Sequence, residues 1–228
     1  SIACKYFQAY EIWAGSMTNL IDTYDYGCHK IMVFDSSSNQ LIYSRTYSCL
    51  FGEYRTTEIG KTESKEFKET VLCPFPKNTV RIEFHTRTQK SNFENKKSIF
   101  VNPKTIVLEP NTYSCETVDL HIGDKPNNAY DLVIVPEGYA LADSAKLRKD
   151  MERCKEAIMN CSPFKEMSHI INIRTVIAYS AESGISQDVK GKHVNTVLES
   201  SFYSLDLERY LMLDQVWKLH DVCANVPY

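Results

Sequence analysis

Glu137 lies at a position where an α/β protein could carry out chemistry. The stretch DLVIVPEGYA, residues 131–140, is a short apolar run that ends at a proline and this glutamate, and a helical pattern follows. Ligands of open α/β sheets bind beside the carboxyl ends of the strands. A carboxylate buried there can act as a general acid or base. No second carboxylate or histidine lies near Glu137 in the sequence, so we favour a structural role, in which it accepts hydrogen bonds from nearby backbone amides.

The histidines show no spacing that is typical of a metal site. The six are His29, His85, His121, His169, His193 and His220, and no two are related as H-x-H or H-x-x-x-H. We therefore predict no metal ligand from local spacing, although distant histidines could converge in the fold. His85 falls on the polar face of a strand pattern, where we expect an exposed side chain. His220 lies near the end of a helical pattern, where the helix dipole favours a cation.

The segment from Ser183 to Ser204 is rich in Gly, Ser, Thr, Asn and Lys and shows little periodicity. Within it, GISQDVKGK (residues 184–192) departs from a phosphate-binding loop, because six residues instead of four separate the first glycine from Gly-Lys and His193 replaces the Ser or Thr. AESGIS also departs from the G-x-S-x-G nucleophile elbow. Irregular segments of this length in a compact domain are usually functional or disordered.

Composition limits the classes of partner. The chain has 228 residues, of which 43% are hydrophobic, enough for one large or two ordinary domains. The net charge of -3 offers no basic field for nucleic acid or anionic lipid, so neither partner is predicted. The apolar runs are far shorter than the roughly 20 residues of a membrane span, and we expect a soluble chain.

The eight cysteines show no C-x-x-C spacing, which excludes a zinc ribbon or a thioredoxin motif. They are sparse for a disulfide scaffold, and we expect most of them to be buried free thiols. Cys154 and Cys161 lie two turns apart on one predicted helix, too far apart for a disulfide.

Residues 1–115 carry mainly strand signals. HKIMVFD and QLIYSRTY flank the turn sequence SSSN and predict a hairpin, TVRIEFHTRTQ alternates apolar and polar residues, and SIFVNPKTIVLEP gives one or two further strands broken at Pro103. A helical pattern competes only around TESKEFKETV. We predict an antiparallel β-sandwich for this domain.

Residues 116–228 change to an α/β pattern. DLVIV predicts a strand that is covered on both faces, and a stripe of Leu147, Met151, Cys154, Ile158 and Cys161 predicts an amphipathic helix. Asp143 or Ser144 can cap that helix, and Pro163 lies beyond its end. INIRTVIAY predicts a second strand. LDLERYLMLDQVWKLHDVC predicts a second helix, with its apolar side chains inward (Leu207, Tyr210, Leu211, Val216 and Trp217). The overall class is α+β.

The order of these motifs resembles one family. DLVIVPEGYA, CSPFKEM, INIRTVIAYSAESGISQD and ESSFYSLDLERYL are similar to the start of the catalytic domain of the bacterial IgA peptidase family of zinc metallopeptidases. LFGEYRTTE, VLCPFPKNTVRIEF and FVNPKTIVLEP are similar to the β-rich domain that precedes it. The resemblance covers nearly the whole chain from about residue 30. It implies an incomplete zincin-like domain, secretion or display at the bacterial cell surface, and a protein or peptide substrate.

The family resemblance also implies a zinc-bound water activated by the glutamate of an H-E-x-x-H helix. This sequence contains no H-E-x-x-H, so the resemblance assigns no catalytic residue and no metal ligand here, and we expect this chain alone to bind no zinc and to be inactive. The resemblance implies that Glu137 is a scaffold residue. His193 and Thr196, in the long polar segment, are the candidates for lining a substrate groove.

Two further expectations follow for the chain as a whole. An incomplete domain leaves an apolar face bare, which we expect the rest of a longer protein or a second copy to cover in a dimer. The alternative function is a non-catalytic β-sandwich module that recognises a glycan or a protein.

Overall fold

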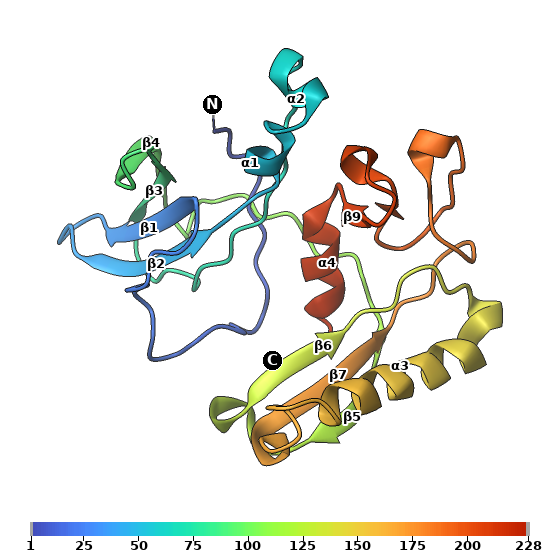
Figure 1. The fold of residues 1–228 in the computed structure, drawn as a ribbon. Helices are drawn as coiled ribbons and strands as arrows, with labels where there is room; N and C mark the ends of the chain where they lie inside the picture. The colour runs from blue at the N-terminus through green and yellow to red at the C-terminus, as the bar shows by residue number, and fades with distance from the viewer. Residues whose placement is uncertain (1, 227–228) are drawn as a thin grey trace. The chain divides into compact units, whose positions relative to one another are not determined.

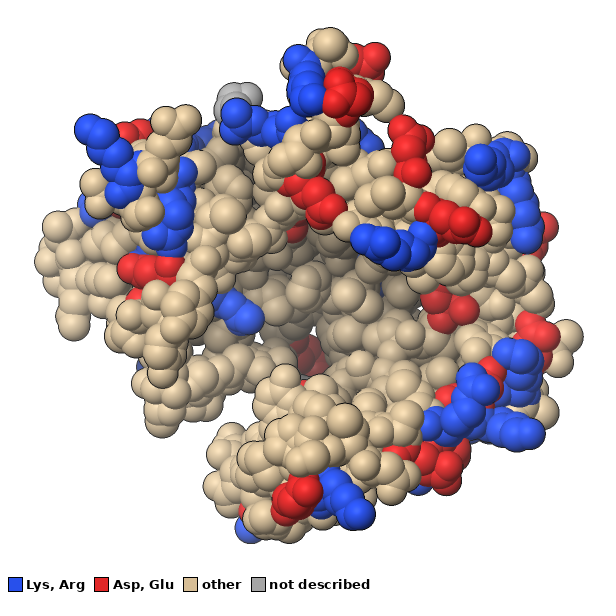
Figure 2. Space-filling model, viewed as in Figure 1, with Lys and Arg blue, Asp and Glu red and all other residues tan. Residues whose placement is uncertain are grey.

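The computed structural model describes residues 2–226, and the chain divides into two compact units, Ser1–Asn111 and Thr112–Tyr228 (Figure 1). The first unit contains an antiparallel sheet with two short helices, and the second combines a mixed sheet with two longer helices. The predicted α+β class is confirmed. On the face drawn in Figure 2, Lys and Arg side chains lie among Asp and Glu.

The first unit has one four-stranded antiparallel sheet with the order β2-β1-β3-β4. Its strands are β1 (His29–Asp35), β2 (Leu41–Tyr47), β3 (Val80–Arg87) and β4 (Phe93–Val101). The predicted hairpin forms from β1 and β2, with Val33 opposite Tyr43. Strand β4 ends at Val101, before Pro103, because proline cannot donate to the ladder. The short helices are α1 (Phe51–Tyr54) and α2 (Glu58–Thr62).

One face of this sheet carries the core of the unit. Its buried residues come from all four strands: Ile31, Val33, Tyr43, Val80, Ile82 and Val101. Partly buried side chains from irregular segments cover them, among them Phe7, Trp13, Leu20, Val71 and Ile106. Among the described residues of this unit, a second sheet, which the predicted sandwich requires, does not form. The physical reason is that the covering segments lack the alternation of a strand and supply apolar side chains from irregular backbone.

His85 lies on the opposite face of β3, and its side chain is not exposed as we expected. Its side chain is only 13% exposed, and its Nε2 lies 2.9 Å from a carboxylate oxygen of Glu83. The other oxygen of Glu83 accepts a hydrogen bond of 2.9 Å from Nε of Arg81. Alternate residues of a strand share one face, so the three polar side chains pack against one another instead of extending into water.

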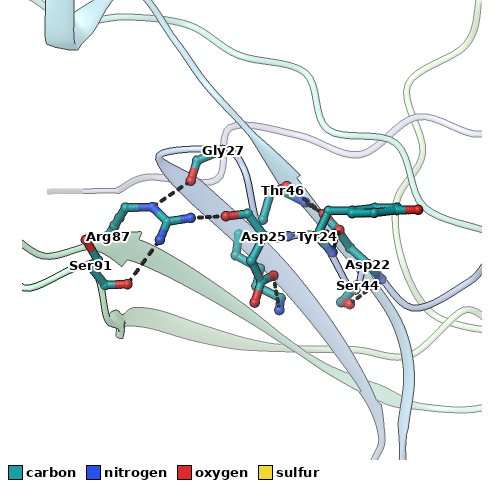
Figure 3. A network of polar contacts seen from close by, with 9 residues as sticks. Asp22, Tyr24, Asp25, Gly27, Ser44, Thr46, Arg87 and Ser91 are labelled. Carbon is teal, nitrogen blue, oxygen red and sulfur yellow. Dashed lines mark hydrogen bonds and ion pairs between the residues drawn. The ribbon is translucent and has the colours of Figure 1, made fainter.

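A polar network ties the segment before β1 to the strands (Figure 3). One oxygen of Asp22 accepts hydrogen bonds from the backbone N–H (2.8 Å) and hydroxyl (2.5 Å) of Thr46. Its other oxygen accepts the N–H groups of Tyr24 and Asp25. Arg87 donates to the carbonyl oxygens of Asp25, Gly27 and Ser91. This irregular segment is therefore held to the sheet by side chains.

Replacing Asp22 with Asn should make the stability of the first unit less dependent on acid. Partial desolvation raises the pKa of Asp22, but hydrogen bonds from Thr46, Tyr24 and Asp25 outweigh it and lower the pKa to about 2. A depressed folded-state pKa contributes stability above the unfolded pKa near 3.8, and that contribution is lost as pH falls from about 4 to 2. Because the group is largely solvated, we expect about 1 kcal/mol. Urea unfolding at pH 7 and pH 2.5 should show a smaller pH effect in Asp22→Asn than in wild type, and an equal pH effect would contradict this assignment.

The second unit has a three-stranded sheet with the order β5-β7-β6. Strands β6 (Tyr130–Ile134) and β7 (Ile171–Ile177) are parallel, while β5 (Glu116–Ile122) pairs antiparallel with β7. All seven residues of β7 are buried, as expected of a central strand with both faces covered. A short two-stranded ladder, β8 (Ser200–Ser201) with β9 (Met212–Leu213), lies outside this sheet.

Helices α3 (Ser144–Met159) and α4 (Val216–Cys223) cover the sheet of the second unit. Leu147 and Met151 of α3 pack against Ile177 of β7, and Val222 of α4 packs against Val176, the preceding residue of the same strand. Successive side chains of a strand point to opposite faces, so the two helices lie on opposite sides of β7 and form three layers. Short 3-10 turns complete the unit: Pro126–Asn128, Leu141–Asp143, Ser168–Ile170, Asp188–Lys190 and Ser204–Asp206.

The first predicted helix is confirmed with two adjustments. Leu147 and Met151 are buried, but Cys161 lies beyond the helix end at Met159 and is exposed. Asp143 occupies the position before the helix, yet its side chain makes no capping bond to α3. Its carboxylate instead accepts a hydrogen bond of 3.0 Å from the N–H of Ala140, at the preceding 3-10 turn.

The second predicted helix is wrong over its first half. Only Val216–Cys223 is helical, while residues 204–206 form a 3-10 turn and residues 212–213 form strand β9. Tyr203, Leu205 and Asp206 have φ values of 64°, 56° and 60°, which are incompatible with a right-handed helix. The apolar residues expected inward, Leu207 and Leu211, are exposed.

All eight cysteines are free thiols, but Cys4, Cys28 and Cys161 are exposed and the other five are only partly buried. The expectation of free thiols is confirmed, and the expectation that most of them are buried is wrong. Within residues 2–226, no helix has the length and apolar character that crossing a membrane requires.

Candidate functional site

The carboxyl ends of β6 and β7 define the candidate site. Because these strands are parallel, their carboxyl ends meet at the same edge of the sheet. The segment after β6 contains Glu137, and the segment after β7 runs through the polar stretch to β8 at Ser200. Chain segments that follow parallel strands at this edge are where ligands bind in open α/β proteins.

Glu137 holds the long segment in place. Its Oε1 accepts hydrogen bonds from the hydroxyl of Thr196 (2.5 Å) and from the N–H (3.1 Å) and hydroxyl (2.9 Å) of Ser200. Its Oε2 accepts the N–H of Leu198 at 3.1 Å. The carboxylate thus accepts backbone amides, as favoured from the sequence, but the donors are 59 to 63 residues away along the chain. Four donors from three residues of one distant segment indicate that this carboxylate has an anchoring role.

Ser180 makes a second anchor beside Glu137. Its hydroxyl accepts the N–H of Gly138 (3.3 Å) and of Val197 (3.0 Å), and its own N–H donates to the carbonyl of Tyr139. Gly138 adopts a φ of +76°, and a Cβ there would lie 2.1 Å from the carbonyl oxygen of Gly184. Only glycine allows this close approach of the two segments.

Ser186 and Asp143 fix the rest of the segment. The hydroxyl of Ser186 donates to the carbonyl of Val194 (3.0 Å) and accepts its N–H (2.9 Å), which closes residues 186–194 into a loop. The hydroxyl of Ser183 donates to the carboxylate of Asp143, and this bond lowers the pKa of Asp143. The polar segment is therefore an ordered structure, although it contains little regular secondary structure.

The two groove candidates occupy different environments. The side chain of His193 is 74% exposed, and its Nδ1 lies 3.1 Å from a carboxylate oxygen of Asp188. The hydrogen bond from His193 lowers the pKa of Asp188, so this carboxylate is charged at neutral pH. Thr196 is 4% exposed, and its hydroxyl donates a hydrogen bond to Glu137. His193 can contact a ligand directly, whereas Thr196 can act only through the segment it holds.

A buried polar cluster on β7 was not found from the sequence. Asn172 is fully buried, donates to Asp131 (2.8 Å) and accepts the N–H of Gly123 (2.9 Å). Arg174 is also buried, and its Nε lies 2.7 Å from a carboxylate oxygen of Asp119. The signal for it was the polar residues within the apolar run INIRTVI. The cluster ties β5 and β6 to β7 and has a structural role.

A cysteine–histidine pair in the first unit is a poor nucleophile. The Sγ of Cys49 lies 3.5 Å from Nε2 of His29. Burial raises the pKa of Cys49 and lowers the pKa of His29, so both groups are neutral near pH 7. A reactive thiol requires the opposite shift, toward thiolate and imidazolium.

The described residues do not fit a zinc site. Across residues 2–226, no group of three His, Cys, Asp or Glu side chains is placed to hold a metal ion. A peptidase zinc needs three such protein ligands with one position left for water.

Comparisons with known families agree with this architecture. Residues 1–98 match the family described as Peptidase M64 N-terminus, and residues 118–228 match the family described as IgA Peptidase M64. The second unit is thus a peptidase domain by family, preceded by the N-terminal region found with it. The chain belongs to the M64 family of IgA peptidases, as the resemblance of its motifs predicts. No curated protein matches the chain.

Proposed function

We propose that this chain is part of a secreted bacterial zinc metallopeptidase that hydrolyses peptide bonds in a protein or peptide substrate. The match of residues 118–228 to the IgA peptidase family carries this proposal. Since these residues offer no ligand set for zinc, the metal would be held by a part of the protein outside this sequence. The role left to this chain is to bind and orient the substrate.

The segment from Ser180 to Ser200 supplies one wall of the proposed substrate groove. It is ordered by Glu137 and lies at the carboxyl edge of the parallel strands. With Nδ1–H of His193 donating to Asp188, the outward Nε2 of this exposed ring is free to accept a hydrogen bond from a peptide N–H. Thr196 is a positioning residue, because among residues 2–226 its hydroxyl bonds only to Glu137.

The alternative function, a non-catalytic module that binds a glycan or a protein, does not explain the peptidase match of the second unit. That a second copy, or another part of the protein, covers exposed apolar side chains such as Leu207 and Leu211 stays a prediction.

The proposed function is tested on the protein encoded by the whole reading frame that contains this sequence. We expect it to cleave peptides in a quenched-fluorescence library, to contain about one zinc per chain by mass spectrometry of the metal, and to lose activity with a chelator. The 228-residue chain, measured in parallel, should show neither zinc nor cleavage. Stoichiometric zinc in the shorter chain, or no cleavage by the longer one, would contradict the proposal.

Replacing His193 with Ala in the whole enzyme should raise KM about fivefold with little change in kcat, because one hydrogen bond to bound peptide is worth about 1 kcal/mol. His169→Ala, at another exposed histidine, is the matched control. Thr196→Val should raise KM, and Thr196→Ser should restore it by returning the hydroxyl. An unchanged KM in both His193→Ala and Thr196→Val would remove this segment from the groove.

A further inference from the structure

An open polar cavity lies at one end of the sheet in the first unit. Three loops form it: residues 35–37 at the end of β1, residues 77–79 before β3, and residues 102–104 after β4. Its volume is about 580 Å³, and all eight of its lining residues are polar. Small-molecule sites occupy roughly 300–1,000 Å³, so the cavity has the size for a sugar ring with its substituents.

Hydrogen bonds order two of the loops around this cavity. Oδ1 of Asp35 accepts the N–H groups of Ser37 (3.0 Å) and Ser38 (2.8 Å) and both of their hydroxyls. These bonds, led by the hydroxyl of Ser37, lower the pKa of Asp35 to about 2 and keep it charged. The N–H of Ser36 donates to the carbonyl of Thr79, which joins two of the loops. A site that is already ordered loses little entropy when a ligand binds.

Several polar groups in the lining make no hydrogen bond or ion pair with the described residues. The ammonium groups of Lys77 and Lys104 make no hydrogen bond or ion pair with residues 2–226, and the side-chain amide of Asn78 makes no hydrogen bond there. Oδ2 of Asp35 likewise accepts none from these residues, because all four donors reach Oδ1. Two cations, one amide and one carboxylate oxygen therefore remain for a ligand.

We propose that this cavity binds an acidic sugar, that is, a pyranose ring that carries a carboxylate. Lys77 and Lys104 pair with the carboxylate, while Asn78 and Oδ2 of Asp35 bond to ring hydroxyls. The lining charge of two lysines against one aspartate favours an anion over a neutral sugar and disfavours a divalent cation. The absence of apolar lining residues excludes an apolar ligand. This site belongs to the first unit and is independent of the peptidase proposal.

The test is a titration of the 228-residue protein followed by two-dimensional NMR of labelled backbone amides. Sodium glucuronate should shift the amides of residues 35–38, 77–79 and 102–104, with a Kd near 1 mM, which is typical of weak sugar binding to an open polar site. Glucose, which has the hydroxyls without the carboxylate, and acetate, which has the carboxylate without the ring, should each bind at least fivefold more weakly.

Substitutions of the two cavity lysines test which side chains contact glucuronate. Lys77→Gln and Lys104→Gln should each weaken glucuronate binding about tenfold, as expected for the loss of one charge-assisted hydrogen bond. Lys61→Gln, at an exposed lysine of α2 in the same unit, should bind like wild type. Equal affinity for glucose or for acetate, or unchanged affinity in both cavity variants, would overturn the proposal.

Discussion

Replacing Glu137 with Ala is expected to destabilise the second unit by about 3 kcal/mol. The change removes the acceptor for the N–H groups of Leu198 and Ser200 and for two hydroxyls, all in partly buried surroundings. Hydrogen bonds to a charged group contribute about 1.5–3 kcal/mol each, and the four bonds on one carboxylate are not additive. Urea unfolding followed by fluorescence measures the loss.

Glu137→Gln tests the contribution of the negative charge to stability without changing the size of the side chain. The amide keeps the volume of the side chain, but its NH2 group faces donors where the second carboxylate oxygen was, so we expect a loss of about 2 kcal/mol. Glu182→Gln is the control, because Glu182 is exposed and accepts one hydrogen bond, from the N–H of Asn195. If Glu137→Ala were as stable as Glu182→Gln, the anchoring role of Glu137 would be refuted.

Replacing Leu147 with Ala is expected to cost about 3 kcal/mol. Leu147 is fully buried and packs with Met151 and Ile177 between α3 and the sheet. Truncation of a buried leucine loses transfer free energy and leaves a cavity, and such changes cost about 2–5 kcal/mol. Thermal and urea unfolding should both report the loss.

Leu141→Ala is the matched control for this change. Leu141 lies six residues earlier and is exposed, so the same substitution there should change stability by less than about 0.5 kcal/mol. Equal effects at the two positions would show that α3 does not pack on the sheet through Leu147.

Strands and the first helix could be predicted because local pattern determines them. The alternation around Ile82 matches the burial that the structure shows. The run 131–135, expected to be a strand covered on both faces, forms strand β6 at the edge of its sheet, and the residues of β6 are only half-buried or exposed. The first half of the helix expected over residues 205–223 failed, because apolar residues at helical spacing do not reveal the positive φ of Leu205 and its neighbours. The sandwich failed for a similar reason, since apolar side chains such as Phe7 and Val71 cover the sheet without forming strands.

The candidate site could be located from the sequence only in part. The position of Glu137 after an apolar strand indicated a structural carboxylate, which pattern analysis can find. Its partners could not be found in this way, because Thr196, Leu198 and Ser200 lie about sixty residues further along in a segment without periodicity. The contrast between the exposed His193 and the buried Thr196 likewise arises from tertiary contacts.

The central claim is that Glu137 orders the segment that follows β7 at the carboxyl edge of the parallel strands. Amide hydrogen exchange of Leu198 and Ser200, compared between wild type and Glu137→Gln, measures this most directly. The predicted result is protection of both amides in wild type and its loss in the variant, while the amides of β7 stay protected. Equal protection of Leu198 and Ser200 in the two proteins would contradict the claim.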